Sequence, residues 1–367
     1  MLFRSRLCGD SVAFFKRVQQ AHVTSYLANA LLAYRLYAKG NDAESLRYFQ
    51  AAIAIRPTHA SFRYNFGKAL GNLGRWDEAI VEFEEARRLV PESAFYEASV
   101  GQALINLNRL AEAERHFRLL LETQPGNALY LTGLARCLFN QGRHDEGIDT
   151  NRRAIAADPK YVLAHRQLKD GYLILRRWEE GQNAWRQLLE LNPPEHQAWD
   201  GYAELGLYLG NEAEYRRART ELLKRFGETT DLQVAERTGR ACLLLPATDD
   251  ELKQATALID RALAVEKPNL HWLKPYLRFA KALAEYRAGR MNNSLELLRG
   301  DTLRTLPPAP SLLLAMVQHR LGQTDAARKT FDTAVRMFDW DPAKATNRET
   351  WMHHILRREA EAVLKSK

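Results

Sequence analysis

Cysteine is scarce in this chain of 367 residues, and the three that occur are far apart. Cys8, Cys137 and Cys242 match no Cys-x-x-Cys pattern, and a sparse, odd-numbered set argues against a disulfide framework. Cys137 and Cys242 lie among apolar neighbours, so we expect both to be small core residues. This cysteine usage is typical of a reducing compartment.

Long hydrophobic runs are also missing from the sequence. No apolar stretch approaches the about 20 residues that span a bilayer. Residues 1–10 carry charges but no apolar core of the kind that a signal peptide needs. We therefore expect a cytoplasmic protein with no membrane partner.

Familiar catalytic motifs are absent as well. The sequence has no P-loop, no His-Glu-x-x-His and no Gly-x-Ser-x-Gly element, the motifs of phosphate binding, zinc hydrolysis and nucleophilic catalysis. His353 and His354 are adjacent, so on a helix they diverge by about 100°, and no third ligand stands at metal spacing. We expect no catalytic residue, no metal site, no cofactor and no enzymatic activity. An active site assembled from distant residues is the alternative that remains open.

A concentrated run of basic residues is missing too, although the net charge is +8. A basic balance is found in proteins that bind nucleic acid, anionic membranes or acidic peptides. Nucleic-acid binding needs a basic stripe, whereas the 53 Lys and Arg are dispersed here among 45 Asp and Glu. We interpret these charges as a solvated helix surface and expect no nucleic-acid partner.

What the sequence does contain is a repeat of 34 residues, marked by Pro57, Pro91, Pro125, Pro159 and Pro193. Turn residues keep the same step at Gly40, Gly74, Asn108, Gly142 and Arg176. One track of small residues is Ser45, Ala79, Ala113, Gly147 and Gly181, and another is Ala33, Gly67, Gly101 and Ala135. A mainly aromatic track is Phe49, Phe83, Phe117, Asn151 and Trp185. A fixed period of this length is typical of stacked helical repeats.

Each track has a physical role in a pair of antiparallel amphipathic helices. Small residues stand where the two helices cross closely, and large apolar residues at helical spacing fill the space between them. The glycine or its substitute ends the first helix in a left-handed conformation. An acid such as Asp77 or Asp145 then begins the second helix as cap and dipole partner, and the proline breaks the chain after it.

These residues match the tetratricopeptide (TPR) pattern, and YNFGKALGNLGRWDEAIVEFEEARRLVP, residues 64–91, resembles a near-consensus repeat. The resemblance implies an all-α fold, a right-handed α-solenoid of helix-turn-helix repeats. We expect six repeats, at 26–59, 60–93, 94–127, 128–161, 162–195 and 196–229. The sixth is degenerate, because Trp199, Tyr202 and Gly210 keep the first-helix pattern but no proline closes it.

Helical hairpins are expected on both sides of residues 26–229. Residues 1–25 predict a partial hairpin, in which 11–21 correspond to a second helix without its first, so we expect a shortened version of a longer ancestral protein. Residues 230–345 predict degenerate TPR-like hairpins, with capping boxes at Thr230 and Thr248 and a clear unit at 312–338. Residues 346–367 predict a C-terminal capping helix and a tail.

The second half carries less generic strings, GYAELGLYLGNEAEYRRAR, AERTGRACLLLPATDDELKQATALIDRALA, FAKALAEYRAGR and NRETWMHHILRREAEAVL. They resemble the C-terminal TPR region of multidomain serine/threonine protein kinases of planctomycete-type bacteria, strongly over 200–364 and more loosely over 11–199. The resemblance implies an interaction region that follows a kinase domain. The Gly-x-Gly-x-x-Gly, His-Arg-Asp and Asp-Phe-Gly motifs of kinases do not occur in this sequence, so we infer no kinase activity.

The TPR resemblance implies a binding surface on the concave face, which the first helices line. Residues not used for packing fall there at steps 2, 5, 9 and 12 of each repeat. The candidates are Tyr34, Tyr37, Tyr64, Lys68, Gln102, Arg136, Phe139, Arg166 and Asp170. Rings supply contact area and Lys or Arg supply charge-assisted hydrogen bonds, so this set suits a peptide of acidic character. The alternative is a hydrated groove with no dedicated ligand.

Two functions fit these observations. The first is a non-catalytic scaffold that binds a peptide or protein partner through the concave surface. The second is the regulatory or docking region of a serine/threonine kinase whose catalytic domain is not in this chain, with that kinase as the partner. A clamp for a chaperone's C-terminal carboxylate is disfavoured, because only Asn65 and Lys68 approach the residues that it needs.

Overall fold

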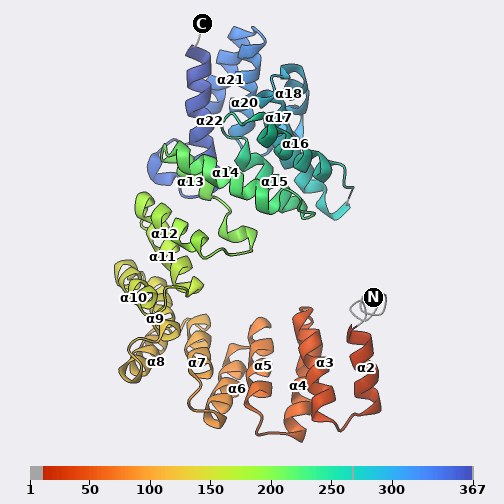
Figure 1. Ribbon diagram of the computed structural model, residues 1–367, viewed down its shortest axis with the longest axis vertical. Helices are drawn as coiled ribbons and strands as arrows, with labels where there is room; N and C mark the ends of the chain where they lie inside the picture. The colour runs from red at the N-terminus through yellow and green to blue at the C-terminus, as the bar shows by residue number, and fades with distance from the viewer. Residues whose placement is uncertain (1–10, 267, 366–367) are drawn as a thin grey trace. The chain divides into compact units, whose positions relative to one another are not determined.

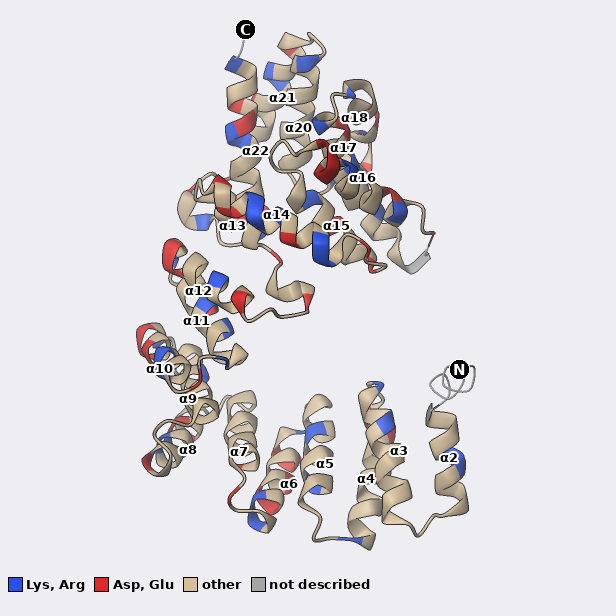
Figure 2. Cartoon of the chain, viewed as in Figure 1, with Lys and Arg blue, Asp and Glu red and all other residues tan. Residues whose placement is uncertain are grey.

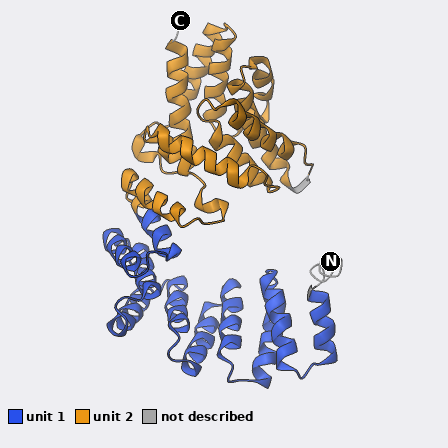
Figure 3. Cartoon of the chain, in the orientation of Figure 1, with its two compact units in different colours: residues 1–171 blue, residues 172–367 orange. Residues whose placement is uncertain are grey.

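The computed structural model describes residues 11–266 and 268–365, and every regular element within these ranges is a helix (Figure 1). Residues 1–10, which include Cys8 and the start of the expected partial hairpin, lie outside the described residues, as do residues 366–367 of the expected tail. The chain divides into two compact units, residues 1–171 and 172–367 (Figure 3). This division falls inside the fifth expected repeat.

Unit 1 is a series of helix pairs that follow α2 (Ser11–Ala21) along the chain. The first helices of the pairs are α3 (Tyr26–Ala38), α5 (Ala60–Asn72), α7 (Ala94–Asn106), α9 (Ala128–Asn140) and α11 (Val162–Ile174), the last of which runs past the division. The second helices are α4 (Asp42–Ile55), α6 (Trp76–Leu89), α8 (Leu110–Thr123) and α10 (His144–Ala157). From α2 to α10 each helix contacts the next.

Residues in the left-handed conformation end the first helices, as the turn track predicts. Gly74 and Gly142 both have a φ of +77°, and Asn108 has a φ of +57° in the equivalent turn. Glycine adopts this conformation without a Cβ clash, and asparagine tolerates it better than most residues. The turn therefore keeps its geometry when the glycine is replaced.

The aromatic and small-residue tracks meet in the core of unit 1. Phe83 and Phe117 are buried. A Cβ added to Gly67 would lie 2.7 Å from Cε1 of Phe83, and one added to Gly101 would lie 2.5 Å from Cζ of Phe117. Both glycines are therefore positions of close approach, and a larger residue there would displace the ring.

The acids expected to cap the second helices are placed differently. Helix α6 begins at Trp76 after the N-cap Arg75, and no side-chain hydrogen bond caps it. The same holds for α10, which begins at His144. Asp77 and Asp145 therefore lie inside the first turn, where a negative charge favours the helix dipole without acting as a cap.

Unit 2 holds shorter and less regular helices. They are α12 (Trp178–Glu190), α13 (Tyr202–Tyr208), α14 (Glu212–Phe226), α15 (Leu232–Cys242), α16 (Asp249–Leu263), α17 (Lys274–Arg287), α18 (Met291–Leu297), α19 (Asp301–Arg304), α20 (Ala309–Arg320), α21 (Thr324–Arg336) and α22 (Arg348–Lys365). The 3₁₀ turns are η1 (His196–Ala198), η2 (Pro268–Leu273) and η3 (Pro342–Lys344).

Residues 196–229, where a sixth repeat is expected, depart from the regular helix pair. A 3₁₀ turn and Gly201, whose φ is +95°, interrupt the chain before α13, which is left with seven residues. The capping box of Thr248 with Glu251 is confirmed at α16. The box expected at Thr230 is wrong, because Asp231 is the N-cap of α15 and its Oδ1 accepts hydrogen bonds from the backbone N–H groups of residues 233 and 234.

The C-terminal helix α22 packs on α20 and α21 and also on α13 (Figure 1). Arg358 of α22 donates hydrogen bonds to the backbone carbonyls of Leu207 and Tyr208 at 3.2 and 3.1 Å. These carbonyls end α13, and a cation at a helix C-terminus is favourable. Thus α22 covers the last helix pair and also joins it to the beginning of the unit.

No helix within 11–266 and 268–365 combines the length and the apolar character needed to cross a bilayer.

Candidate functional site

Five of the nine candidate residues recur at one step on successive first helices of unit 1, and the other four stand at the fifth or twelfth position, one helical turn away on the same face. The ninth position of each repeat holds Tyr34, Lys68, Gln102, Arg136 and Asp170, and the second position holds Leu27, Ser61, Phe95, Leu129 and Leu163. Seven residues are about two helical turns, so both positions share a face about 10 Å apart. We call this face the first-helix surface; it has a mainly apolar edge and a mainly polar edge.

Aromatic and cationic side chains from neighbouring first helices touch on this surface. Nζ of Lys68 lies 5.2 Å from the ring centroid of Tyr37 and 5.6 Å from that of Tyr64, at cation–π distance. The ring of Tyr64 lies 4.9 Å from that of Phe95. Burial raises the pKa of Tyr64 to about 12, so its hydroxyl stays neutral and the residue contributes mainly apolar area.

Arg136 of α9 reaches across to α7. Its Nη1 donates a hydrogen bond to Oε1 of Gln102 at 2.6 Å, and its Nη2 donates to Oδ1 of Asn106 at 3.4 Å. Burial among the neighbouring side chains lowers the pKa of the Arg136 guanidinium, although its outer atoms reach solvent. An arginine stays charged at neutral pH regardless, so the two amides orient this charge without neutralising it.

A hollow of about 210 Å³ opens beside these groups, and we call it the α7–α9 hollow. A Cβ on Gly133 would collide with the ring of Phe117, so this buried ring packs directly against Gly133 in the wall of the hollow. Its other main lining residues are Tyr64, Phe95, Leu129, Leu163, Gln102, Arg136 and Gln167. The hollow is thus largely apolar, with two amides and one guanidinium at its edge.

The structure brings Tyr37, Tyr64, Lys68, Gln102 and Arg136 together in two contact groups, and Tyr64 and Phe95 join the first group to the hollow. Arg166 is exposed on α11, one residue before Gln167, and its side chain makes no ion pair or hydrogen bond within the described part of the chain. Asp170 forms an ion pair with Lys169.

Tyr34 and Phe139 lie outside these contact groups. Tyr34 is half-buried, with its ring 5.3 Å from that of Phe49, and burial raises the pKa of its hydroxyl. Phe139 packs where α10 and α11 have no side chain: a Cβ on Gly147 or on Gly171 would come within 2.8 Å of its ring. Phe139 is therefore placed as a packing residue between helices, and the prediction of ligand contact has no support from its position.

Sequence reasoning missed the apolar edge of the surface. Phe95 and Leu163 are 53% and 40% exposed, and both stand at the second position of their repeats. The signal was available, because a large apolar residue stands at this position in four of the five repeats, with Ser61 as the exception. Gln167 gave no such signal, since its position is occupied by different residue types in the other repeats.

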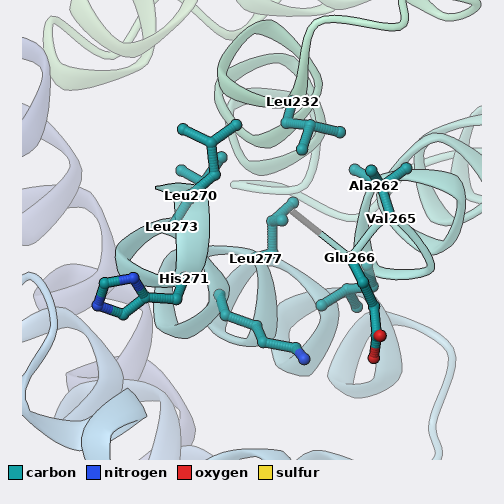
Figure 4. Close-up of a pocket in the computed structure, with 10 residues that line it drawn as sticks. Leu232, Ala262, Val265, Glu266, Leu270, His271, Leu273 and Leu277 are labelled. Carbon is teal, nitrogen blue, oxygen red and sulfur yellow. The ribbon is translucent and has the colours of Figure 1, made fainter. Parts of the chain in front are cut away.

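A second hollow, of about 240 Å³, lies in unit 2 between α15, α16 and α17 (Figure 4). Leu232, Leu270, Leu273 and Leu277 give it apolar walls, and Glu266 stands at its edge. Glu266 adjoins residue 267, which lies outside the described residues. We assign no ligand to this hollow.

Unit 2 also contains a buried ionic cluster beneath α22. Nε of Arg240 donates to Oε1 of Glu236 at 2.6 Å, and both side chains are buried. Asp200 accepts from Arg237 and from Arg348 of α22. Burial raises the pKa of Glu204 to about 7 and lowers the pKa of His353 to about 4. These groups line neither hollow, and their contacts join α22 to α13 and α15.

Metal-ligating side chains do not cluster within the described ranges. No group of three or more His, Cys, Asp or Glu side chains there could hold a metal ion. Cys137 and Cys242 are buried and unpaired by a disulfide, and burial raises the pKa of the Cys137 thiol to about 12. Neither thiol is poised to act as a ligand or a nucleophile at neutral pH.

Comparison with protein families identifies the repeats. A family model described as tetratricopeptide repeat matches residues 30–94, 64–128 and 100–162. Residues 30–162 are thus TPR repeats, and the expected fold class, an all-α solenoid of TPR helix pairs, is confirmed. No curated protein matches the chain.

Several solved structures are similar to parts of the chain. PilW, a type IV pilus biogenesis factor, is 18% identical, with 57% of this chain and 96% of that chain covered and a TM-score of 0.44. MamA residues 41-end from Desulfovibrio magneticus RS-1 is 18% identical over 50% and 94% of the two chains, with a TM-score of 0.34. Human IFIT1 in complex with m7Gppp-AAAA is 16% identical over 85% and 72%, with a TM-score of 0.43. Such low identities and scores assign no ligand to this chain.

Proposed function

We propose that this chain is a non-catalytic interaction scaffold that binds a peptide or protein segment of acidic character on the first-helix surface of unit 1. The main support is a separation of charge between the two kinds of helix. The first helices α3, α5, α7, α9 and α11 carry six Lys or Arg and two Asp or Glu. The second helices α4, α6, α8 and α10 carry seven Lys or Arg and thirteen Asp or Glu (Figure 2).

The cations of the first-helix surface are also available to a ligand. Lys68, Arg136 and Arg166 have no carboxylate partner among the described residues. Some exposed arginines of the second helices, such as Arg88 and Arg118, are instead paired with Glu85 and Glu114. A partner carboxylate can therefore meet Lys68, Arg136 or Arg166 without displacing an ion pair of the scaffold.

The test is binding of acidic peptides selected from a display library of short random peptides. Reversing Lys68, Arg136 and Arg166 to Glu together should weaken binding by at least about tenfold, because 1.4 kcal/mol already corresponds to a tenfold change. The affinity of the unmodified protein should also fall as salt rises. Retained affinity in the triple variant would contradict the proposal.

A matched control separates the surface from net charge. Arg47, Arg115 and Arg153 are exposed on α4, α8 and α10, and their reversal to Glu changes the total charge by the same amount. This control variant should keep its affinity for the acidic peptides. Circular dichroism of both variants should show unchanged helicity.

The kinase-linked alternative is supported only by the sequence resemblance over 200–364. It proposes that the partner is a serine/threonine kinase domain upstream of these repeats or encoded separately. The intact mass of the native protein tests it: a product much larger than this chain that contains a kinase domain would favour the alternative. We also propose a cytoplasmic location, which the sparse cysteines support.

A further inference from the structure

The α7–α9 hollow suits a large ring better than an aliphatic side chain. Phe95 and Leu163 line it and are partly exposed, and the buried ring of Phe117 forms an apolar part of its wall. An apolar cavity of about 150 Å³ holds benzene, and this hollow measures about 210 Å³. It therefore has room for a bicyclic aromatic ring.

One residue that lines the hollow carries an acceptor that lacks a donor. Oε1 of Gln167 is buried and has no hydrogen-bond partner within the described residues. The hydroxyls of Ser99 and Thr132, which line the same hollow, already donate to the backbone carbonyls of Phe95 and Ala128. An unsatisfied buried acceptor is unfavourable, and an indole Nε1–H is a donor attached to a ring of the required size.

Arg136 defines what stands beside that ring. Its guanidinium lines the hollow and is held by the amides of Gln102 and Asn106 rather than by a carboxylate. Guanidinium groups in partly enclosed sites form strong paired hydrogen bonds with carboxylates. A ligand that inserts a ring into the hollow and carries an acid next to it would satisfy both features.

Resting on the proposed function, we propose that the α7–α9 hollow receives a tryptophan side chain of the partner segment, and that a carboxylate adjacent to this tryptophan pairs with Arg136. Gln167 accepts the indole N–H, and Phe95 and Leu163 cover the ring. The recognised element is therefore a tryptophan next to Asp or Glu within an acidic segment.

The probe is a set of acidic host peptides that differ at one position, which is Trp, Phe, Leu or Ala. The Trp host should bind most tightly, and the Ala host should lose about tenfold to a hundredfold in affinity, as expected when a large apolar side chain is no longer buried. Equal affinities for the Trp and Ala hosts would overturn the inference.

Variants of the protein locate the effect in the hollow. Phe95→Ala with Leu163→Ala should remove most of the preference for Trp over Ala. The control pair, Phe14→Ala with Leu119→Ala, makes the same two changes at residues that are 51% and 61% exposed on other surfaces, and it should leave the preference unchanged. Gln167→Met should lower the affinity for the Trp host to about the affinity for the Phe host. The affinity for the Phe host itself should not change.

The outcomes distinguish this inference from the proposed function. If no acidic host binds, the proposed function itself fails. If the hosts bind and the triple charge reversal abolishes their binding, the scaffold proposal stands. The tryptophan site is nevertheless excluded if the four hosts bind equally, or if the Phe95 and Leu163 variant behaves like its control. Arg136→Gln should weaken hosts with the acid beside Trp more than hosts with that acid moved away.

Discussion

Glu204 is a fully buried carboxyl whose ionisation is opposed by its surroundings. Burial is the main cause of its raised pKa, about 7, and nearby Asp200 adds to it, while Arg240 and Arg348 act in the opposite direction. An acid with a raised pKa binds a proton more tightly in the folded state than in the unfolded state. Its stabilising contribution is therefore present below its ordinary pKa of about 4.5 and is lost as pH rises through 7.

The variant Glu204→Gln tests this at the residue scale. Glutamine imitates the protonated acid at every pH, so the free energy of unfolding of the original protein should fall relative to that of the variant by about 3 kcal/mol between pH 5 and pH 8. Chemical denaturation at several pH values measures the difference. His353, whose pKa is lowered to about 4, titrates in both proteins and cancels.

Glu285 provides the matched control for this prediction. It is also buried, but hydrogen bonds from Arg290, Lys281 and Asn293 lower its pKa to about 2. Its contribution is present above its ordinary pKa and is lost only as pH falls toward 2. The difference between the original protein and Glu285→Gln should be constant from pH 5 to 8, and a constant difference for Glu204→Gln as well would mean that Glu204 stays ionised.

The 34-residue tracks predict how single residues pack wherever the track is unbroken. Phe83 and Gly67 meet because both follow the 34-residue step. In the fourth repeat the aromatic track is interrupted by Asn151, which is buried with both polar side-chain atoms unpaired in the described structure. In this repeat Phe139 supplies the ring from the first helix of the pair. Its position in the repeat predicts that it lies on the binding surface, but in the structure it packs between helices.

At the scale of elements, arginine contacts within unit 2 hold α22 in addition to its packing on the last helix pair. Arg287 of α17 donates from Nη2 to Oε2 of Glu359 at 2.7 Å. The same guanidinium donates to the backbone carbonyls of Leu243 and Leu244 at 2.8 and 2.7 Å, just after α15. A single buried side chain therefore joins three segments that are distant in sequence.

Arg287→Met should loosen α22 from the rest of unit 2. The change leaves Glu359 and two carbonyls without their donor, and breaking a buried pair in this way costs about 3–5 kcal/mol. Hydrogen exchange should show faster exchange across α22 and the end of α15. Arg357→Met is the control, because Arg357 pairs with Glu361 within α22 and is more exposed, so its loss should cost under about 1 kcal/mol. Equal effects of the two variants would contradict this role.

The existence of α22 could be predicted from sequence, but its packing could not. Residues 346–367 predict a capping helix and a tail, and the helix observed is Arg348–Lys365. Its contact with α13 depends on Arg358 reaching two backbone carbonyls, and backbone acceptors leave no trace in the residue types. In addition, the Gly201 interruption that shortens α13 lies in the repeat where the periodic pattern is weakest.

At the scale of the whole molecule, net charge conceals how the charges are arranged. The excess of +8 looked dispersed along the sequence, yet sorting the residues by helix separates a cationic set of first helices from an acidic set of second helices. The 34-residue period would have allowed this sorting before the structure was available. The hollow could not be found in this way, because its shape depends on Gly133 and Gln167, which belong to no track.

The division into two compact units predicts that the chain does not unfold in a single step. Stability in repeat proteins is a sum of local contributions and nearest-neighbour interfaces, and units with separate cores often unfold separately. Trp76 is the one tryptophan of unit 1, whereas the other six of the seven are in unit 2. Tryptophan fluorescence therefore reports mainly on unit 2, while circular dichroism reports on the helices of both units.

Denaturation followed by the two signals should give transitions that do not coincide. Glu204→Gln should shift the fluorescence transition, because Glu204 lies in the core of unit 2. Of the circular dichroism change, it should shift only the part that reports the unfolding of unit 2. If the two signals coincide, and if this variant shifts the entire dichroism curve, the units unfold together. In that case the pH dependence of Glu204 would extend to the binding surface of unit 1.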